Sequence, residues 1–367
     1  RSAQRILCDQ LKKPSGVWIM AYTDIDDPTA NFNTILWTGD GNSSRSITGV
    51  GFAPDMIWWK GRDTTFDHRL IDTLRSGTYP DLLYPNATTA ESEDANNAEA
   101  IGSDGFTVGS GNAVNQNTKT YVAWNWKAGG SGSANTDGTI TSTVSANTTA
   151  GFSIGTYTAN ATAGATVGHG LGVAPDMLIV KVRNNTNNWA VYHESVGATK
   201  ALYLDSTSGE TTDGWMNNTA PSSSVFTLSG GNYGNASGYE VVFYAFAEKQ
   251  GFSKFGSYTG NGSSNGPYIH TGFLPAFVMI KRTDTTSDWN IMDNKRAVSF
   301  NPNTKELYAN SNQAEATGGQ TIRDYLSNGF KLRGTSGGTN ASGGTYIFMA
   351  FAESPFANSN GTPNNAE

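Results

Sequence analysis

The chain is poor in cysteine, in charge and in long apolar runs. Cys8 is the only cysteine among 367 residues, so an intrachain disulfide is impossible and the fold depends on packing. Charged residues are 15% of the chain and the net charge is −7, which argues against the basic face of a nucleic-acid binder and against docking on acidic membranes. No apolar run approaches the roughly 18 residues of a transmembrane helix. We therefore expect no nucleic-acid partner and no membrane insertion.

The sequence also lacks the motifs of a catalytic or metal centre. It has no HExxH, EF-hand loop, P-loop, Gly-x-Ser-x-Gly elbow or nucleophilic cysteine context. The four histidines do not cluster with acids at metal-ligand spacing; they are His68, His169, His193 and His270. We expect no catalytic residue, no metal ligand and no cofactor, and hence a protein that is not an enzyme.

Aromatic residues and turn formers are abundant. The chain has 9 Trp, 15 Tyr, 17 Phe and 43 Gly. Short runs of aromatic and β-branched residues are separated by clusters of Gly, Asn and Ser, and few stretches favour long helices. This texture predicts an all-β fold with enough apolar side chains for several cores.

A ten-residue pattern occurs three times, at residues 51–60, 172–181 and 272–281. Each copy ends on a lysine: Lys60, Lys181 or Lys281. A proline, expected in a turn or at a strand entry, precedes a continuous apolar run. Such a run predicts a strand covered on both faces, central in its sheet. The copies lie 121 and 100 residues apart, longer than a solenoid unit, so each copy predicts a domain of its own.

Several acidic residues recur with the pattern. Asp55 and Asp176 are expected to cap backbone N–H groups beside the proline turn. Twelve residues after each motif lysine comes Asp72, His193 or Asp293, and Arg75 or Arg296 follows two of these. We interpret these pairs as exposed local ion pairs worth about 0.5 kcal/mol. No spacing selects the two facing carboxylates that glycoside hydrolysis needs.

Each copy closes with a strand that alternates large and mostly small side chains. The large ones are Val122, Trp124 and Trp126; Val242, Tyr244 and Phe246; Ile347, Met349 and Phe351. The small face predicts close approach of another layer or of a neighbouring chain.

These repeats predict three tandem jelly-roll or lectin-like β-sandwich repeats of about 100 residues each. We place an N-terminal arm at 1–31, repeat 1 at 32–127, a Gly/Ser/Thr-rich linker at 128–151, repeat 2 at 152–249, repeat 3 at 252–356 and a flexible tail at 357–367. An extra strand through Ile140 and Val144 is the alternative for the linker.

Ligand recognition is expected in the loops, where aromatic residues, Asn and Ser supply rigid contact area and adaptable hydrogen bonds. The candidates are Trp215, Asn232, Tyr233 and Asn235 of repeat 2. The alternative interpretation is a half-buried tryptophan beside ordinary turn residues.

With the repeat laid out, the chain resembles a family of phage virion proteins, common in marine and cyanobacterial phages and described as tail fibres or as a domain of unknown function. The likeness rests on residues 25–28, 51–60, 121–130, 135–138, 257–262 and 346–356. It covers most of the chain. Residues 1–24 fall outside it and are expected to form an attachment arm.

The resemblance implies a structural phage protein of a tail fibre or similar appendage, made in the host cytoplasm and located on the virion. It implies other virion proteins as partners, a homotrimer by analogy, and a host cell-surface glycan as ligand, bound with avidity by several weak sites. It transfers no catalytic residue. A capsid-decorating or head-fibre protein, a glycan-degrading tail-spike enzyme and a secreted adhesin are the alternatives.

Overall fold

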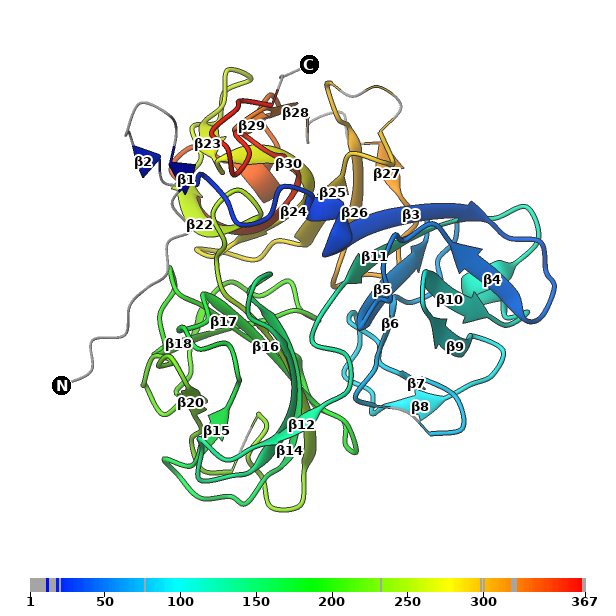
Figure 1. Ribbon diagram of the computed structural model, residues 1–367, viewed down its shortest axis with the longest axis vertical. Coiled ribbons are helices and arrows are strands. Elements are labelled where there is room, and N and C mark those ends of the chain that lie inside the picture. The colour runs from blue at the N-terminus through cyan, green and yellow to red at the C-terminus, as the bar shows by residue number, and fades with distance from the viewer. Residues whose placement is uncertain are drawn as a thin grey trace.

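The structure is a computed structural model that describes residues 11–12, 18–19, 21–75, 77–231, 233–297, 299, 301–317 and 322–364. It is an all-β protein built from antiparallel sheets (Figure 1), as the composition predicts. Within these ranges, helices are limited to one 3-10 turn and two single-turn α-helices: η1 (Pro28–Ala30), α1 (Asn112–Asn115) and α2 (Gly337–Asn340).

Three groups of strands, here called unit 1 (32–127), unit 2 (128–249) and unit 3 (252–356), each contain one large sheet (Figure 1). In unit 1 the order is β3 (Phe32–Thr38), β11 (Thr120–Trp126), β5 (Met56–Gly61) and β6 (Arg69–Asp72). In unit 2 the matching strands are β14 (Phe152–Thr158), β21 (Glu240–Phe246), β16 (Met177–Val182), β17 (Ala190–His193), β18 (Lys200–Tyr203) and β19 (Thr211–Thr212). In unit 3 they are β22 (Ser253–Thr259), β30 (Thr345–Pro355), β24 (Phe273–Arg282), β25 (Trp289–Asp293), β26 (Lys305–Tyr308) and β27 (Ala316–Thr317).

A small sheet covers the outer face of each large sheet. In unit 1 it consists of β4 (Arg45–Thr48), β10 (Gly105–Val108) and β9 (Ala98–Gly102), with the short hairpin β7 (Asp81–Leu82) and β8 (Ser92–Glu93) nearby. Unit 2 has β15 (Thr166–Gly168) and β20 (Val225–Thr227), and unit 3 has β23 (Tyr268–His270), β29 (Gly329–Leu332) and β28 (Arg323–Leu326). Each pair of sheets encloses its own apolar core.

The repeated ten-residue pattern forms the predicted buried central strand. All six residues of β5 and of β16 are buried, and so are residues 277–281 of β24. Each of these strands lies between the closing strand of its unit and the next strand of the sheet. Pro54 and Pro175 precede their strands as predicted, whereas Pro275 lies inside β24, where the pairing with β30 is irregular. A bulge tolerates the missing proline N–H.

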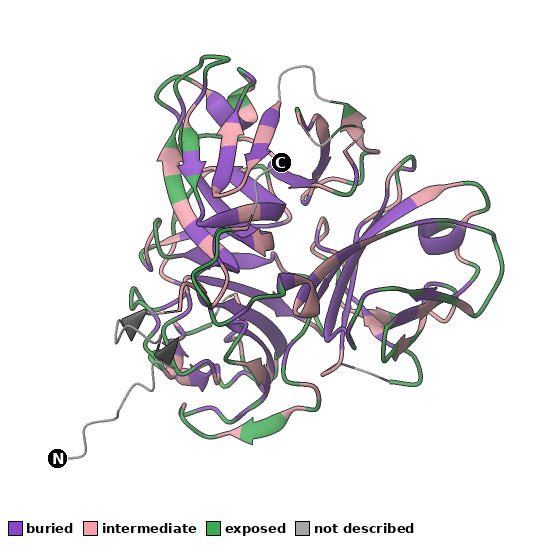
Figure 2. Ribbon diagram, turned by 45° about the horizontal axis from the view of Figure 1, so that its top comes forward, coloured by how far each residue is buried: buried purple, intermediate pink, exposed green. Residues whose placement is uncertain are grey.

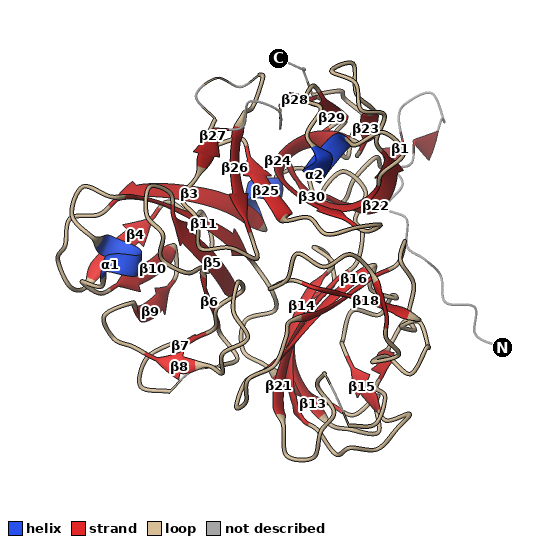
Figure 3. Ribbon diagram, turned by 180° about the vertical axis from the view of Figure 1, so that it is seen from behind, coloured by secondary structure: helices blue, strands red, loops and turns tan. Residues whose placement is uncertain are grey.

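The inner faces of the three large sheets meet in a single shared core. It contains large side chains from all three closing strands, among them Trp124 and Trp126 of β11, Tyr244 and Phe246 of β21, and Met349 and Phe351 of β30. Aromatic pairs join the units: Phe32 stacks on Phe351 with centroids 5.1 Å apart. The buried residues therefore continue from sheet to sheet through the centre of the molecule (Figure 2), and the three units surround this core (Figure 3).

The alternation of the closing strands is confirmed, and the structure decides what each face contacts. The large residues point to the shared core, and the residues between them point to the core of their own unit, as Ala123, Ala245 and Ala350 do. The layer that lies close to the small side chains of the closing strand is therefore the small sheet of the same unit. The alternative that the small face meets a neighbouring chain is wrong for this face.

The segment expected to be a flexible linker adds two strands to unit 2. These are β12 (Ser133–Asn135) and β13 (Ser142–Asn147), and β13 pairs with β14 along its whole length. Val144 is buried in the core of unit 2. The alternative of an extra strand describes this segment correctly, because β-branched residues at alternating positions pack on the sheet even in a Gly/Ser/Thr-rich stretch.

Both chain ends pack against unit 3 where the structure describes them. The Tyr22 hydroxyl donates to the carbonyl of Gly272 (2.7 Å), and Ile25 enters the shared core. Ser359 donates through its backbone N–H to Asp26 (2.6 Å). The described part of the expected tail, 357–364, thus forms a turn fastened to the arm. The short strands β1 (Leu11–Lys12) and β2 (Trp18–Ile19) pair with each other.

Candidate functional site

The three motif lysines are buried and hold loops together. Lys60, Lys181 and Lys281 are each 0% exposed. Lys181 Nζ donates to the carbonyls of Thr88 in unit 1 (2.9 Å) and Asn187 (2.8 Å), and Lys281 Nζ donates to Thr207 in unit 2 (2.8 Å). Burial lowers the pKa of all three ammonium groups to about 8. The best-preserved motif therefore ends in a group that fixes backbone carbonyls.

Eight residues after each lysine, the ring N–H of a Trp or His lies against a backbone carbonyl of another unit. Trp189 Nε1 of unit 2 donates to the carbonyl of Tyr84 in unit 1 (3.0 Å), and Trp289 Nε1 of unit 3 donates to Tyr203 in unit 2 (2.9 Å). His68 Nε2 of unit 1 lies 3.0 Å from the carbonyl of Tyr308 in unit 3. Each unit thus contacts the preceding one, and the three contacts close a ring.

We call the three contacts between units joints and name each one by its two units: joint 1/2, joint 2/3 and joint 3/1. Buried ion pairs lie at joints 1/2 and 3/1. At joint 1/2, Arg75 Nε contacts Asp72 Oδ2 (2.7 Å), and the Tyr244 hydroxyl of unit 2 donates to the same oxygen (2.6 Å). At joint 3/1, Arg296 Nε contacts Asp293 Oδ2 (2.6 Å), and Trp124 Nε1 of unit 1 donates to it (2.9 Å). These four charged side chains are 0% exposed, so the prediction of exposed pairs is wrong. Their partners come from another unit, which spacing along the chain does not show.

A second ion pair accompanies each of these joints. Arg183 of unit 2 contacts Glu91 of unit 1 through Nε and Oε2 (2.9 Å), and Arg62 of unit 1 contacts Glu315 of unit 3 in the same way (2.9 Å). Glu91 also reaches Arg75 (3.2 Å), and Glu315 reaches Arg296 (3.1 Å). Each buried charge at joints 1/2 and 3/1 therefore has an opposite charge within its network.

Joint 2/3 replaces this network with less polar residues at the same repeat positions. His193 stands where the others have Asp, Val196 where they have Arg, and Met349 where they have the donor Tyr244 or Trp124. His193 Nε2 lies 3.2 Å from the carbonyl of Phe348 of unit 3, and its Nδ1 accepts from the N–H of Ser195. Burial lowers the pKa of His193 to about 4. At joint 2/3 the acid, the arginine and the hydrogen-bond donor of the other joints are thus all replaced.

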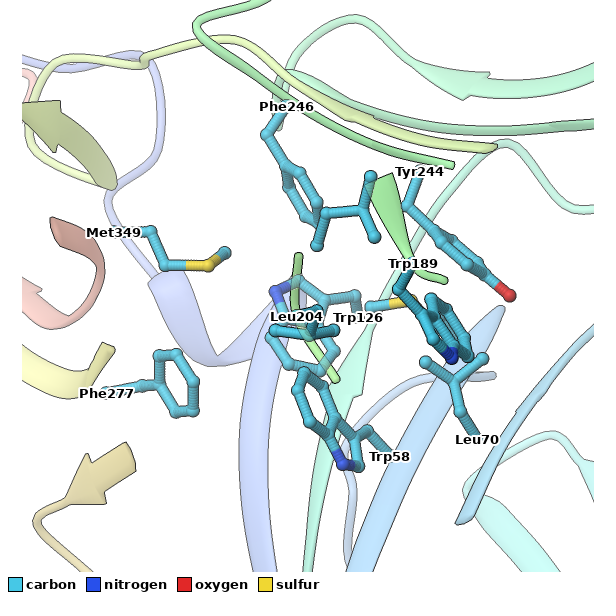
Figure 4. A pocket seen from close by; sticks show the side chains of 11 residues that line it. Trp58, Leu70, Trp126, Trp189, Leu204, Tyr244, Phe246, Phe277 and Met349 are labelled. Carbon is cyan, nitrogen blue, oxygen red and sulfur yellow. The ribbon is translucent and has the colours of Figure 1, made fainter. Parts of the chain in front are cut away.

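A small void lies where the three units meet. It measures about 10 Å³, and its lining is apolar and comes from all three units, including Trp58 and Trp126, Tyr244 and Phe246, and Phe277 and Met349 (Figure 4). An apolar space of this size has no room for an organic ligand. The centre of the molecule is a packed core.

The acids beside the motif prolines serve the fold. Asp55 accepts from the backbone N–H of Ala128 (2.7 Å) and Asp176 accepts from that of Glu248 (2.5 Å), which confirms the capping prediction. In the described part of the chain, no three His, Cys, Asp or Glu side chains are grouped so that they could hold a metal ion. No helix there is long and apolar enough to cross a membrane.

Two of the four predicted ligand-binding residues are buried. Trp215 is 1% exposed and packs in the core of unit 2. Asn235 is 0% exposed, and its amide donates to the carbonyls of Thr162 (2.9 Å) and Ser229 (2.7 Å). Neither side chain reaches the surface, so the prediction that Trp215 and Asn235 contact a ligand is corrected: both support the fold. Asn232 lies outside the described residues.

Asn235 is one of three equivalent buried asparagines. Asn115 and Asn340 occupy the same place in units 1 and 3, and the three side chains accept a backbone N–H from the loop after β3, β14 or β22. All three precede the central aromatic or Met of the closing strand by nine residues. That constant spacing is a signal in the sequence from which this structural role could have been found.

Tyr233 lies differently from the other candidates. It is half-buried, and its ring packs on the buried ring of Tyr203 with centroids 5.4 Å apart. With four polar residues it lines a surface hollow of about 340 Å³ at joint 1/2; these residues are Thr88, Thr186, Asn187 and Asn188. The sequence pointed to Tyr233, but the other four residues come from two loops that only the joint brings together.

Fold and joints together define a class: an all-β protein in which three sheets with the same strand order close around one core. A family model described as a domain of unknown function (DUF7483) matches residues 27–355. The chain belongs to this family. The match extends across all three units as a single domain. No curated protein and no solved structure matches the chain.

Proposed function

We propose that this protein is a non-enzymatic structural component of a phage particle, part of a tail fibre or similar appendage that contacts the host surface. The observation that carries the proposal is the ring of three units closed around one core. The sequence resemblance to phage virion proteins supplies the context. In this proposal the three units are copies of one jelly-roll or lectin-like β-sandwich.

The use of the repeated polar residues supports a structural role. The motif lysines, the Asp–Arg pairs and the buried asparagines all bind backbone groups or one another. A catalytic acid or base must reach a substrate proton, and these groups are buried inside units or between them. Rigid joints suit a part that transmits force or presents a surface.

The closed ring also bears on the proposed homotrimer. Three sheets already meet around one core within a single chain, so association of three chains would use outer surfaces. The exposed large apolar residues of the described chain are scattered over it: Leu36, Tyr79, Val173, Tyr268 and Phe356. A polar interface, sensitive to salt, is expected, and light scattering at low and high ionic strength would measure it.

Virion location is tested on particles of the phage that carries this gene. Purified particles are analysed by mass spectrometry, with the major capsid protein as an internal reference, and labelled with gold-coupled antibodies against the chain. We expect the chain in the particles and the label at the tail. Label on the head would favour the decoration alternative, and absence of the chain from washed particles would overturn the proposal.

A further inference from the structure

We propose that the hollow at joint 1/2 binds one neutral sugar residue, with the ring of Tyr233 as its stacking surface. This inference rests on the proposed role of the protein at the host surface and names the site of contact. The hollow measures about 340 Å³, at the lower end of ligand-site volumes of roughly 300–1,000 Å³, which suits a small ligand.

The polar side chains around the hollow are available for a ligand. Thr186 is exposed, and Thr88, Asn187 and Asn188 are half-buried. Their backbone groups take part in the joint, for Asn187 N–H donates to the Thr88 carbonyl (2.9 Å). Among the described residues, the Thr hydroxyls and Asn amides of this set make no hydrogen bond within the protein. Amides and hydroxyls both donate and accept, as the hydroxyl groups of a sugar require.

The aromatic wall is specific to unit 2. Counting back two residues from the equivalent buried asparagines, Tyr233 corresponds to Ala113 in unit 1 and Gly338 in unit 3. Because the scaffold is repeated and this side chain is not, the fold alone does not require a ring here. An aromatic face packs against the C–H groups of a sugar ring, while its hydroxyl groups turn toward polar neighbours.

The backbone of Tyr233 is strained. Its φ is +46°, in the left-handed region, which is rare for a bulky side chain. The following residue, Gly234, has φ +107°. The strain places the ring over Tyr203 at the edge of the hollow. Strain of this kind persists where the surrounding structure imposes it, and it concentrates at ligand sites.

The floor of the hollow is fixed by a residue of the motif. Lys181 Nζ, itself buried, holds the carbonyls of both Thr88 and Asn187. Lys181 is thus a positioning residue that brings a loop of unit 1 and a loop of unit 2 to the same place. The five described residues that line the hollow carry no charge, which favours a neutral sugar over an acidic one.

The test uses the full chain and saturation-transfer NMR with a panel of neutral hexose, N-acetylhexosamine and deoxyhexose oligosaccharides at millimolar concentration. Tyr233→Gly removes the ring and relieves the positive φ, so loss of the fold does not confound it. Tyr268→Ala, which removes an exposed tyrosine of unit 3, is the matched control. We expect at least tenfold weaker binding for Tyr233→Gly, about threefold weaker binding for Asn188→Ala, and no change for Tyr268→Ala.

Two results would overturn the site: no saturation transfer to any member of the panel, or equal binding by the wild type and Tyr233→Gly. Host polysaccharide and free oligosaccharide are measured in separate arms, so that a polymer-specific effect of avidity is distinguished from binding of a single sugar. Failure here leaves the virion-location experiment unaffected, because that experiment measures where the chain resides.

Discussion

At the residue scale, buried ionisable groups dominate the chemistry of this protein. His193 is neutral in the fold, since its Nδ1 accepts a hydrogen bond from Ser195 and its Nε2 faces a carbonyl. Lys181 lies in a similar enclosed place, where burial lowers its pKa to about 8. In both cases the folded state disfavours the protonated form.

Acid should weaken joint 2/3 through His193. Its pKa is about 4 in the fold against 6.5 unperturbed, so between these values the unfolded chain binds the proton and the folded chain does not. The free energy of unfolding then falls as pH decreases from 6.5 to 4, by about 3 kcal/mol for this group. Urea unfolding across this range should show a smaller fall in His193→Gln, which cannot titrate. An equal fall in both proteins would contradict the assignment.

Loss of one buried carboxylate should be costly. Asp72→Asn leaves Arg75 without its main partner and disturbs the bond from Tyr244. We expect the free energy of unfolding to fall by about 3–5 kcal/mol, as for broken buried ion pairs. Chemical denaturation measures it, with Asp63→Asn as a surface control, whose carboxylate lies 3.9 Å from exposed Lys119. A loss no larger than that of the control would contradict the network.

At the element scale, the joints show how one interface can be built in two ways. Joints 1/2 and 3/1 use a carboxylate, an arginine and a donor from the next closing strand, whereas joint 2/3 uses His193, Val196 and Met349. Well-packed apolar residues often replace a buried ion pair at little cost. The four strands β3, β11, β5 and β6 of unit 1 have counterparts in the same order in units 2 and 3, so the two kinds of joint differ in the side chains that these strands carry.

Placing the three residues of joint 2/3 at the equivalent positions of joint 1/2 should therefore avoid much of the stability loss caused by Asp72→Asn. The triple variant Asp72→His, Arg75→Val and Tyr244→Met removes the buried charges together. We expect it to be at least about 2 kcal/mol more stable than Asp72→Asn, because no buried charge is left alone. Thermal and urea unfolding of both proteins compare them. If the three changes simply add, with the triple variant the least stable, the joints are not interchangeable.

At the scale of the whole molecule, the shared core makes the three units one structure. Each large sheet buries its inner face only against the other two, so no unit has two covered faces by itself. The ring is closed by head-to-tail contacts, the arrangement that rotational symmetry requires of a closed assembly.

The full chain should accordingly unfold in a single cooperative transition. Calorimetry is expected to give one peak with equal calorimetric and van't Hoff enthalpies. Unit 2 expressed alone, residues 128–249, should bind a hydrophobic dye and associate, because its inner face is then exposed. Three separate peaks, or a soluble monomeric unit 2 without dye binding, would contradict a shared core.

Much of the scaffold could be predicted from local pattern. A continuous apolar run after a proline indicated β5 and β16 correctly, and period two in β11, β21 and β30 identified their two faces, because side-chain direction in a strand depends on neighbours in sequence. Pro275 shows the limit of this reasoning, since a bulge accommodates it within β24. The segment 128–151 was misjudged as a linker because small polar residues hide a strand whose apolar positions are few.

Residue type and spacing were enough to predict the repeat, the all-β class and the burial of the motif strand. Three further features became visible only in the folded molecule: the three inner faces share one core, Lys181 holds a loop of another unit, and Tyr233 lines a hollow with Thr88. These contacts join residues from about 90 to more than 300 positions apart. Which faces meet at such distances depends on how whole sheets pack, and local periodicity carries no information about that.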